Sequence, residues 1–202
     1  MAFPTTNSTQ ELPAVNQILQ SCGQAPVTTL DQTNPDVAIA YSTLTQVSKE
    51  VQAEGWSFNL ELDYEFTPDT NNEILIPNNV LQIDPAPEYF ELDVVRRNGK
   101  LYDKVKHSYT FTDILKCDVK WLLDWIDLPI PIQDYILARS ATIVSSRIVG
   151  DTSQFQMLGQ KEAYNRAMAL EYECNQGDYS FFGHPRGINS YNSFKPYHAL
   201  YR

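Results

Sequence analysis

The chain has 202 residues, of which 43% are hydrophobic and 20% charged, and its formal net charge is −10. A chain of this length can bury the core of one domain, and the composition is that of a globular protein rather than of a disordered polymer. The acidic charge argues against a sequence-reading DNA-binding protein, which needs a basic surface, but it suits a wall past which DNA slides without sticking.

Several kinds of site are not predicted. The longest apolar runs are interrupted and too short to span a bilayer, and the first ten residues lack the features of a secretory signal, so we expect synthesis in a cytoplasm and no membrane contact. Cys22, Cys117 and Cys174 form no CxxC pair, and Cys22 and Cys174 are expected to be buried free thiols on apolar helical faces. The three histidines share no metal-ligand spacing, so neither a metal nor a cofactor is predicted.

The first elements in chain order are two helices. Residues 11–22 place apolar side chains on one face at helical spacing, and Gly23 follows as a stop. Asn34 is a good N-cap and Pro35 a good first-turn residue for a second amphipathic helix that ends near Gly55. The two helices are expected to form a helical hairpin.

At Trp56 the period of the hydrophobic pattern changes. Residues 56–66 alternate apolar and polar side chains, which predicts a half-buried strand. Short strands are expected over 73–77 and 80–84, and Asn98-Gly99 predicts a tight hairpin within 92–104. Residues 119–129 are expected to be extended as well. The region 56–128 is therefore predicted to be mostly antiparallel β structure.

Two longer helices are predicted after Pro131. They end at Gly150 and Gly177, and both show helical apolar spacing. The predicted fold class is thus α+β. Residues 1–55 supply the N-terminal hairpin of a four-helix bundle, residues 56–128 are a β insertion, residues 129–177 complete the bundle, and residues 178–202 form an extended tail.

The tail differs in composition from the rest of the chain. It holds seven of the 24 aromatic residues and three basic side chains against one acidic one. Disordered segments are usually poor in aromatic residues, so this segment is predicted to dock onto another surface. The alternative is that it packs over its own domain. The candidate partner-binding residues are Phe181, Phe182, Tyr191, Phe194, Tyr197 and Tyr201.

Three carboxylates near the start of the β region could be catalytic or could form an ordinary solvated surface. Glu61, Asp63 and Glu65 are predicted to share the polar face of one strand, with neighbours about 6–7 Å apart, and glycoside hydrolases use paired carboxylates. Such polar faces are routine in acidic proteins, and no GxSxG, Walker, GxGxxG or HExxH motif is present. No catalytic residue is predicted, although cleavage of a polysaccharide stays open as the alternative function.

The opening residues resemble a known family. Ala14-Val15-Asn16, Ile18-Leu19, Gly23, Pro26-Val27, Thr29-Leu30 and Gly55-Trp56, followed by Phe58-Asn59 and Glu61, are similar to the N-terminal pattern of tail tubular protein A of short-tailed, podovirus-type bacteriophages. Residues 123–141, Val149-Gly150-Asp151 and residues 170–182 resemble the family too. The resemblance is weakest across residues 67–120.

This resemblance implies a structural protein of the virion tail. It implies an adaptor, or gatekeeper, ring of twelve copies between the portal protein and the tail nozzle protein (tail tubular protein B), with the genomic DNA passing through it. The helices are expected to build the ring, the β region to face the nozzle and the tail fibres, and the C-terminal segment to reach the portal. No membrane partner is implied.

Overall fold

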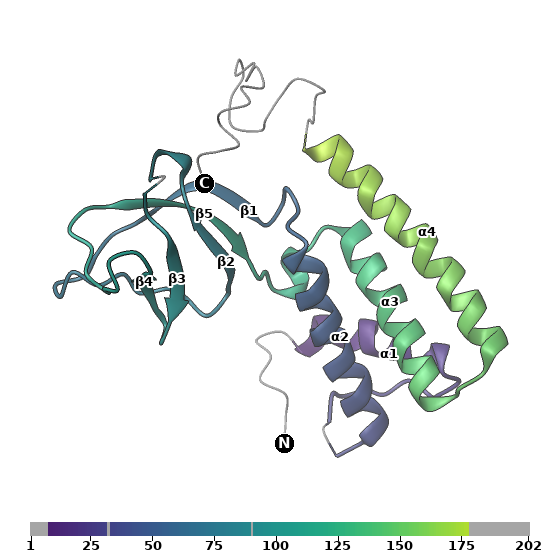
Figure 1. Cartoon of the computed structure of the whole chain (residues 1–202). Coiled ribbons are helices and arrows are strands. Elements are labelled where there is room, and N and C mark those ends of the chain that lie inside the picture. The colour runs from purple at the N-terminus through teal and green to yellow at the C-terminus, as the bar shows by residue number, and fades with distance from the viewer. Residues whose placement is uncertain (1–7, 32, 90, 178–202) are drawn as a thin grey trace. The chain divides into compact units, whose positions relative to one another are not determined.

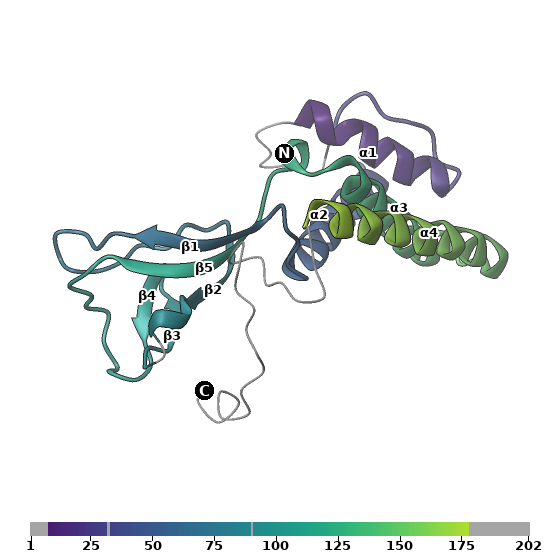
Figure 2. The same ribbon diagram turned by 90° about the horizontal axis from the view of Figure 1, so that it is seen from above.

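The computed structural model describes residues 8–31, 33–89 and 91–177 (Figures 1 and 2). The chain divides into two compact units. A helical unit contains the residues up to Glu54 together with Leu123–Glu173, and a β unit is built from Gly55–Leu122. A short 3-10 turn, η2 (Trp125–Asp127), precedes the second pair of helices.

The helical unit is built around three helices that pack closely on one another: α1 (Ser8–Ser21), α2 (Pro35–Ala53) and α3 (Ile130–Ile148). The start of α2 is as predicted, because the Asn34 side chain accepts a 3.0 Å hydrogen bond from the backbone N–H of Asp36. The core joins the apolar faces of all three helices, and its fully buried members include Val15, Ile18, Leu19, Val37, Val47, Val51, Ile132, Tyr135 and Ile136.

The fourth helix, α4 (Thr152–Gln176), follows α3 after a sharp turn. Gly150 has a φ of +71°, and the Asp151 carboxylate accepts the backbone N–H of Ser153 at 2.9 Å. Both views place α4 alongside α3 (Figures 1 and 2). Only Ala169 and Glu173 are buried among its residues, so the expected four-helix bundle is a closely packed three-helix core with a loosely attached fourth helix.

In its described residues the β unit holds five strands. The first sheet contains β1 (Leu60–Phe66), β2 (Val80–Pro85) and β5 (Leu115–Trp121) in the order β1-β5-β2, and both pairings are antiparallel. The second sheet is the hairpin of β3 (Val94–Arg97) and β4 (Lys100–Asp103). The core lies between them and includes Phe66, Ile74, Val94, Leu101, Phe111, Leu115, Cys117 and Val119. A short 3-10 turn, η1 (Pro87–Tyr89), follows β2.

The predicted hairpin at Asn98-Gly99 is confirmed. Both residues have positive φ, +53° and +74°, as a two-residue turn with the twist of the flanking strands requires. Arg97 pairs with Lys100 directly across this turn.

The prediction of one continuous strand over 56–66 is wrong in two respects. Residues 56–59 form a turn, in which the buried Asn59 side chain accepts the backbone N–H of Trp56 at 2.8 Å and donates to the carbonyl of Trp121 at 2.9 Å. With both hydrogen bonds made, the Asn59 amide can be buried at little cost. The alternation of apolar and polar residues does not reveal that this polar side chain is buried.

The second error is the assumption of regular alternation along the strand. The register between β1 and β5 shifts between Glu61 and Tyr64, and Asp63 has a φ of +57°, which marks a bulge. Glu61 therefore stands opposite Val119 on the core side of the sheet, whereas Glu65 stands opposite Lys116 on the other side. The three carboxylates do not share one face.

Two further expectations are corrected. Residues 73–77 form only isolated bridges, Glu73 with Thr110 and Leu75 with Lys100, rather than a strand. The extended segment predicted over 119–129 stops at Trp121 and gives way to η2. A tight turn there lets Gln133 donate to the carbonyls of Trp125 and Leu128.

Candidate assembly surface

Helix α4 exposes an unusual amount of apolar surface for a helix of a small domain. Met157, Tyr164 and Met168 retain exposed fractions of 72%, 65% and 41%. They are seven and four residues apart, and these spacings return to nearly the same face of a helix with 3.6 residues per turn. Phe155 and Leu170 are also exposed, at 47% and 44%. We call Met157, Tyr164 and Met168 the α4 stripe.

The opposite side of α4 is attached to the three-helix core by polar contacts. The Arg166 guanidinium donates to the hydroxyl of Tyr135 at 2.6 Å and to both carboxylate oxygens of Glu54 at 3.3 Å. The Asn165 amide donates to the carbonyl of Asp134 at 3.0 Å, and the Gln154 amide donates to the carbonyl of Ser21. These bonds fix the orientation of the helix and so fix which face the α4 stripe presents.

Tyr135 is central to this attachment. It is 1% exposed, and the guanidinium of Arg166 lies 5.4 Å from its ring centroid. The hydrogen bond that Arg166 donates to the Tyr135 hydroxyl is the first cause of the raised pKa of Arg166, followed by the bond with Glu54. The pair of Arg166 and Glu54 is exposed to solvent, where ion pairs stabilise a fold by only about 0–1 kcal/mol.

Packing beneath α4 is incomplete. A cavity of about 190 Å³ lies between this helix, α1 and α3, lined by residues that include Gln17, Ala138, Leu158 and Asn165. Protein interiors normally leave few voids larger than a water molecule. The helix therefore gains little from burial within its own chain, and its apolar stripe remains free for another surface.

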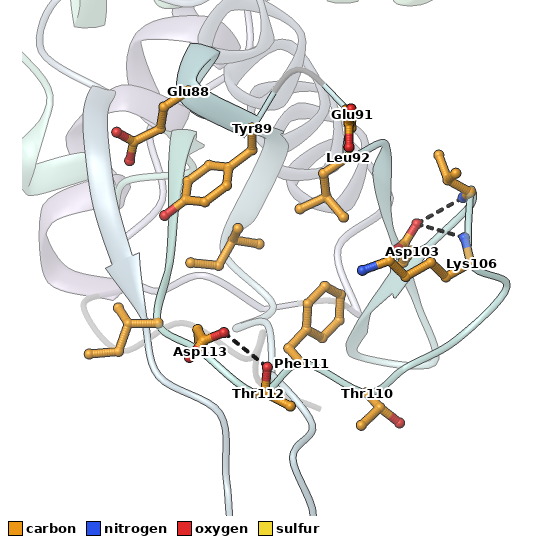
Figure 3. Close-up of a pocket in the computed structure, with 13 residues that line it drawn as sticks. Glu88, Tyr89, Glu91, Leu92, Asp103, Lys106, Thr110, Phe111, Thr112 and Asp113 are labelled. Atoms are coloured by element: carbon orange, nitrogen blue, oxygen red, sulfur yellow. Dashed lines mark hydrogen bonds between the residues drawn. The ribbon is translucent and has the colours of Figure 1, made fainter.

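The β unit contains a larger cavity of about 760 Å³. Apolar side chains, which include Tyr89, Leu92, Phe111 and Leu115, and acidic side chains both line it (Figure 3). Asp103, a buried residue that lines this cavity, accepts the backbone N–H groups of Val105 and Lys106 at 2.8 and 3.1 Å. A carboxylate bound in this way holds a turn.

The carboxylates singled out in the sequence lie elsewhere. Glu61, Asp63 and Glu65 are exposed on β1 and are not among the residues that line the large cavity. Glu61 accepts the indole N–H of Trp121 at 2.9 Å. The structure thus does not bring these carboxylates together across a groove, which paired catalytic carboxylates require.

The two thiols expected to be buried differ in exposure. Cys22 is buried, as predicted, whereas Cys174 is exposed, because the side of α4 that carries it faces away from the core. Burial raises the pKa of the Cys117 thiol to about 12, so this thiol is inert at neutral pH. Among the described residues, no group of three His, Cys, Asp or Glu side chains could hold a metal ion.

The six aromatic residues proposed for partner binding, Phe181, Phe182, Tyr191, Phe194, Tyr197 and Tyr201, lie outside the described residues. The α4 stripe was not predicted from the sequence. The signal for it was present, since Met157, Tyr164 and Met168 follow helical spacing on a different face from Leu158, Asn165 and Ala169.

A small acidic chain with a loosely attached helix and an exposed apolar stripe has the properties of a structural subunit that assembles with other proteins. The model of the family described as tail tubular protein matches residues 12–179, and the chain belongs to this family. It is similar to tail tubular protein A of Klebsiella phage KP34, with 26% identity over 168 residues that cover 83% of this chain and 89% of the relative. The protein is accordingly a structural component of the phage virion tail. No helix in the described ranges is long and apolar enough to cross a membrane.

Proposed function

We propose that this tail protein forms an adaptor ring between the portal and the tail nozzle. The observation that carries the proposal is the α4 stripe, since three apolar side chains at helical spacing gain burial only against another molecule. A ring requires a heterologous interface, in which one surface of a copy meets a different surface of the next. A stripe on one side of the helical unit can supply one half of such an interface.

The same proposal assigns the other partners. Residues 178–202 dock on the portal through their aromatic side chains, and the β unit faces the nozzle protein and the tail fibres. The net charge of −10 suits a channel wall that lets genomic DNA pass without specific binding. These assignments extend the family resemblance, and twelve copies is the number that it implies.

Sedimentation of the protein alone and with its portal tests the proposal. We expect self-association that is concentration-dependent, and co-sedimentation with the portal. A protein that remains monomeric at high concentration and leaves the sedimentation of the portal unchanged would refute the adaptor assignment. Measured release of reducing ends from capsular glycan would instead support the enzymatic alternative, although Glu61, Asp63 and Glu65 do not line the large cavity.

A further inference from the structure

The hairpin of β3 and β4 carries a concentrated positive charge in an acidic protein. Residues 96–107 contain five of the 15 Lys and Arg residues of the chain and a single acidic residue, Asp103. Asp103 is buried and hydrogen-bonded to the backbone, so its charge does not stand on the outer surface. The rest of the chain is correspondingly more acidic than the overall charge suggests.

Part of this charge is compensated locally. Lys100 pairs with Glu73 at 2.5 Å, Lys104 pairs with Asp93 at 2.6 Å, and Arg96 donates to the side chain of Asn78. Arg97 and Lys106 are exposed, and neither lies within 4.0 Å of a carboxylate in the described ranges. These two cations are the ones available to a partner.

Aromatic rings hold the free arginine in place. The Arg97 guanidinium lies 4.3 Å from the ring centroid of Tyr102, and the Tyr102 and Tyr109 rings are 4.9 Å apart. The Tyr102 hydroxyl is 3.4 Å from Nδ1 of His107. An arginine that is already stacked loses less side-chain freedom on binding, and Arg and Tyr are enriched where proteins bind one another. We call Arg97, Tyr102, Lys106, His107 and Tyr109 the hairpin surface.

The opposite side of the same unit is acidic. Strand β1 pairs with β5, β5 pairs with β2, and β2 contacts β3, so β5 and β2 separate β1 from the hairpin. Figures 1 and 2 both place β1 and the hairpin on different sides of the β unit. In the described structure β1 pairs only with β5, and its free edge is flanked by the exposed Glu61, Asp63 and Glu65, of which Glu61 and Glu65 lie on opposite faces of the strand.

We propose that the hairpin surface of one copy binds the acidic β1 edge of the next copy. The two surfaces have opposite charge and lie on different sides of the β unit, as the two halves of a head-to-tail interface do. The proposal rests on the ring proposed above and assigns it a second contact, between neighbouring β units.

The contact uses side-chain charges rather than strand pairing. Acidic residues and a bulge protect an edge strand from forming a continuous sheet with another chain, and β1 has both. These features therefore allow a side-chain contact with a basic partner while they prevent uncontrolled β association. Charge pairs at a rim mainly determine specificity and association rate, and they weaken with salt.

Two charge-reversed proteins test the contact. The hairpin variant carries Arg97→Glu and Lys106→Glu, and the strand variant carries Glu61→Lys and Glu65→Lys. In low salt each variant alone is expected to self-associate about tenfold more weakly than the parent chain. Mixed in equal amounts, the two are expected to recover assembly, because the acidic hairpin of one then faces the basic edge of the other.

A matched control is Lys49→Glu, compared with Arg97→Glu alone, since Lys49 is exposed on α2 in the helical unit. Circular dichroism and thermal unfolding of every variant establish that the fold is retained. Parent-like assembly of both variants, or a mixture no stronger than either variant, would overturn this contact while leaving the ring in place. Failure of the parent chain itself to assemble, with or without its portal, would overturn both the ring and the contact.

Discussion

The most informative perturbation removes the apolar character of the α4 stripe without shortening its side chains much. We consider Met157→Gln, Tyr164→Gln and Met168→Gln together, because Gln has a helix propensity close to that of Met. Complete burial of a large apolar side chain stabilises by about 1.5–3 kcal/mol. Scaled by the exposed fractions of 72%, 65% and 41%, the stripe can contribute about 3–5 kcal/mol per contact.

Ordering the three side chains at an interface opposes this gain by about 0.5–1.5 kcal/mol each. A net loss of about 1–2 kcal/mol per contact remains, which weakens association by roughly fivefold to thirtyfold. The isolated subunit should be almost unaffected, since these side chains are already largely in water. Sedimentation velocity over a concentration series, combined with thermal unfolding, separates the two effects.

A single change at another exposed apolar position, Ile126→Gln, is the matched control, since Ile126 is 50% exposed in η2. It is expected to change neither assembly nor melting temperature appreciably. If the triple variant assembles like the parent chain, or if it melts many degrees lower as a monomer, the α4 stripe is not an assembly surface.

Three other predictions follow from separate features. Burial raises the pKa of Glu11 above its ordinary value, so the fold loses stability as rising pH ionises this carboxyl group. The variant Glu11→Gln should therefore melt at a higher temperature than the parent chain at pH 7 and lose this advantage below about pH 4. Equal effects of the substitution at both pH values would contradict the assignment. A chain that ends at Gly177 should melt like the full chain but not bind the portal, with Phe194→Ala and Tyr197→Ala each weakening binding in part; retained portal binding would show that the segment has another role. The whole protein should show no measurable affinity for duplex DNA at physiological salt, and tight binding that falls steeply with added salt would count against a channel wall.

The helices could be predicted from sequence because local signals define them. Asn34 with Pro35 begins α2, and Gly150 with Asp151 separates α3 from α4, so each boundary depends on residues within one or two turns. The hairpin at Asn98-Gly99 is equally local, since only a few residue types tolerate two successive positive φ angles.

The errors arose where a distant strand decides the local structure. The bulge at Asp63 depends on the register with β5, and Asn59 is buried because the carbonyl of Trp121 lies within reach of its amide. Neither partner can be identified from the alternation of apolar and polar residues. The expected common face of Glu61, Asp63 and Glu65 was wrong for this reason.

The candidate surfaces were only partly accessible from sequence. Periodicity places Met157 and Tyr164 on a helix, but it does not reveal that Arg166 and Asn165 hold the opposite face against α3. The cations around the Asn98-Gly99 turn are visible in the sequence, whereas the stacking of Arg97 on Tyr102 and the position of β1 on the other side of the unit need the topology.

Native mass spectrometry of the protein bound to its portal tests the adaptor ring most directly. The account predicts a complex whose added mass equals a closed ring of this chain, with twelve copies as the family resemblance implies, and loss of that ring in the α4 stripe variant. A portal that gains no mass, or that binds scattered single copies while the chain stays monomeric, would contradict the adaptor ring.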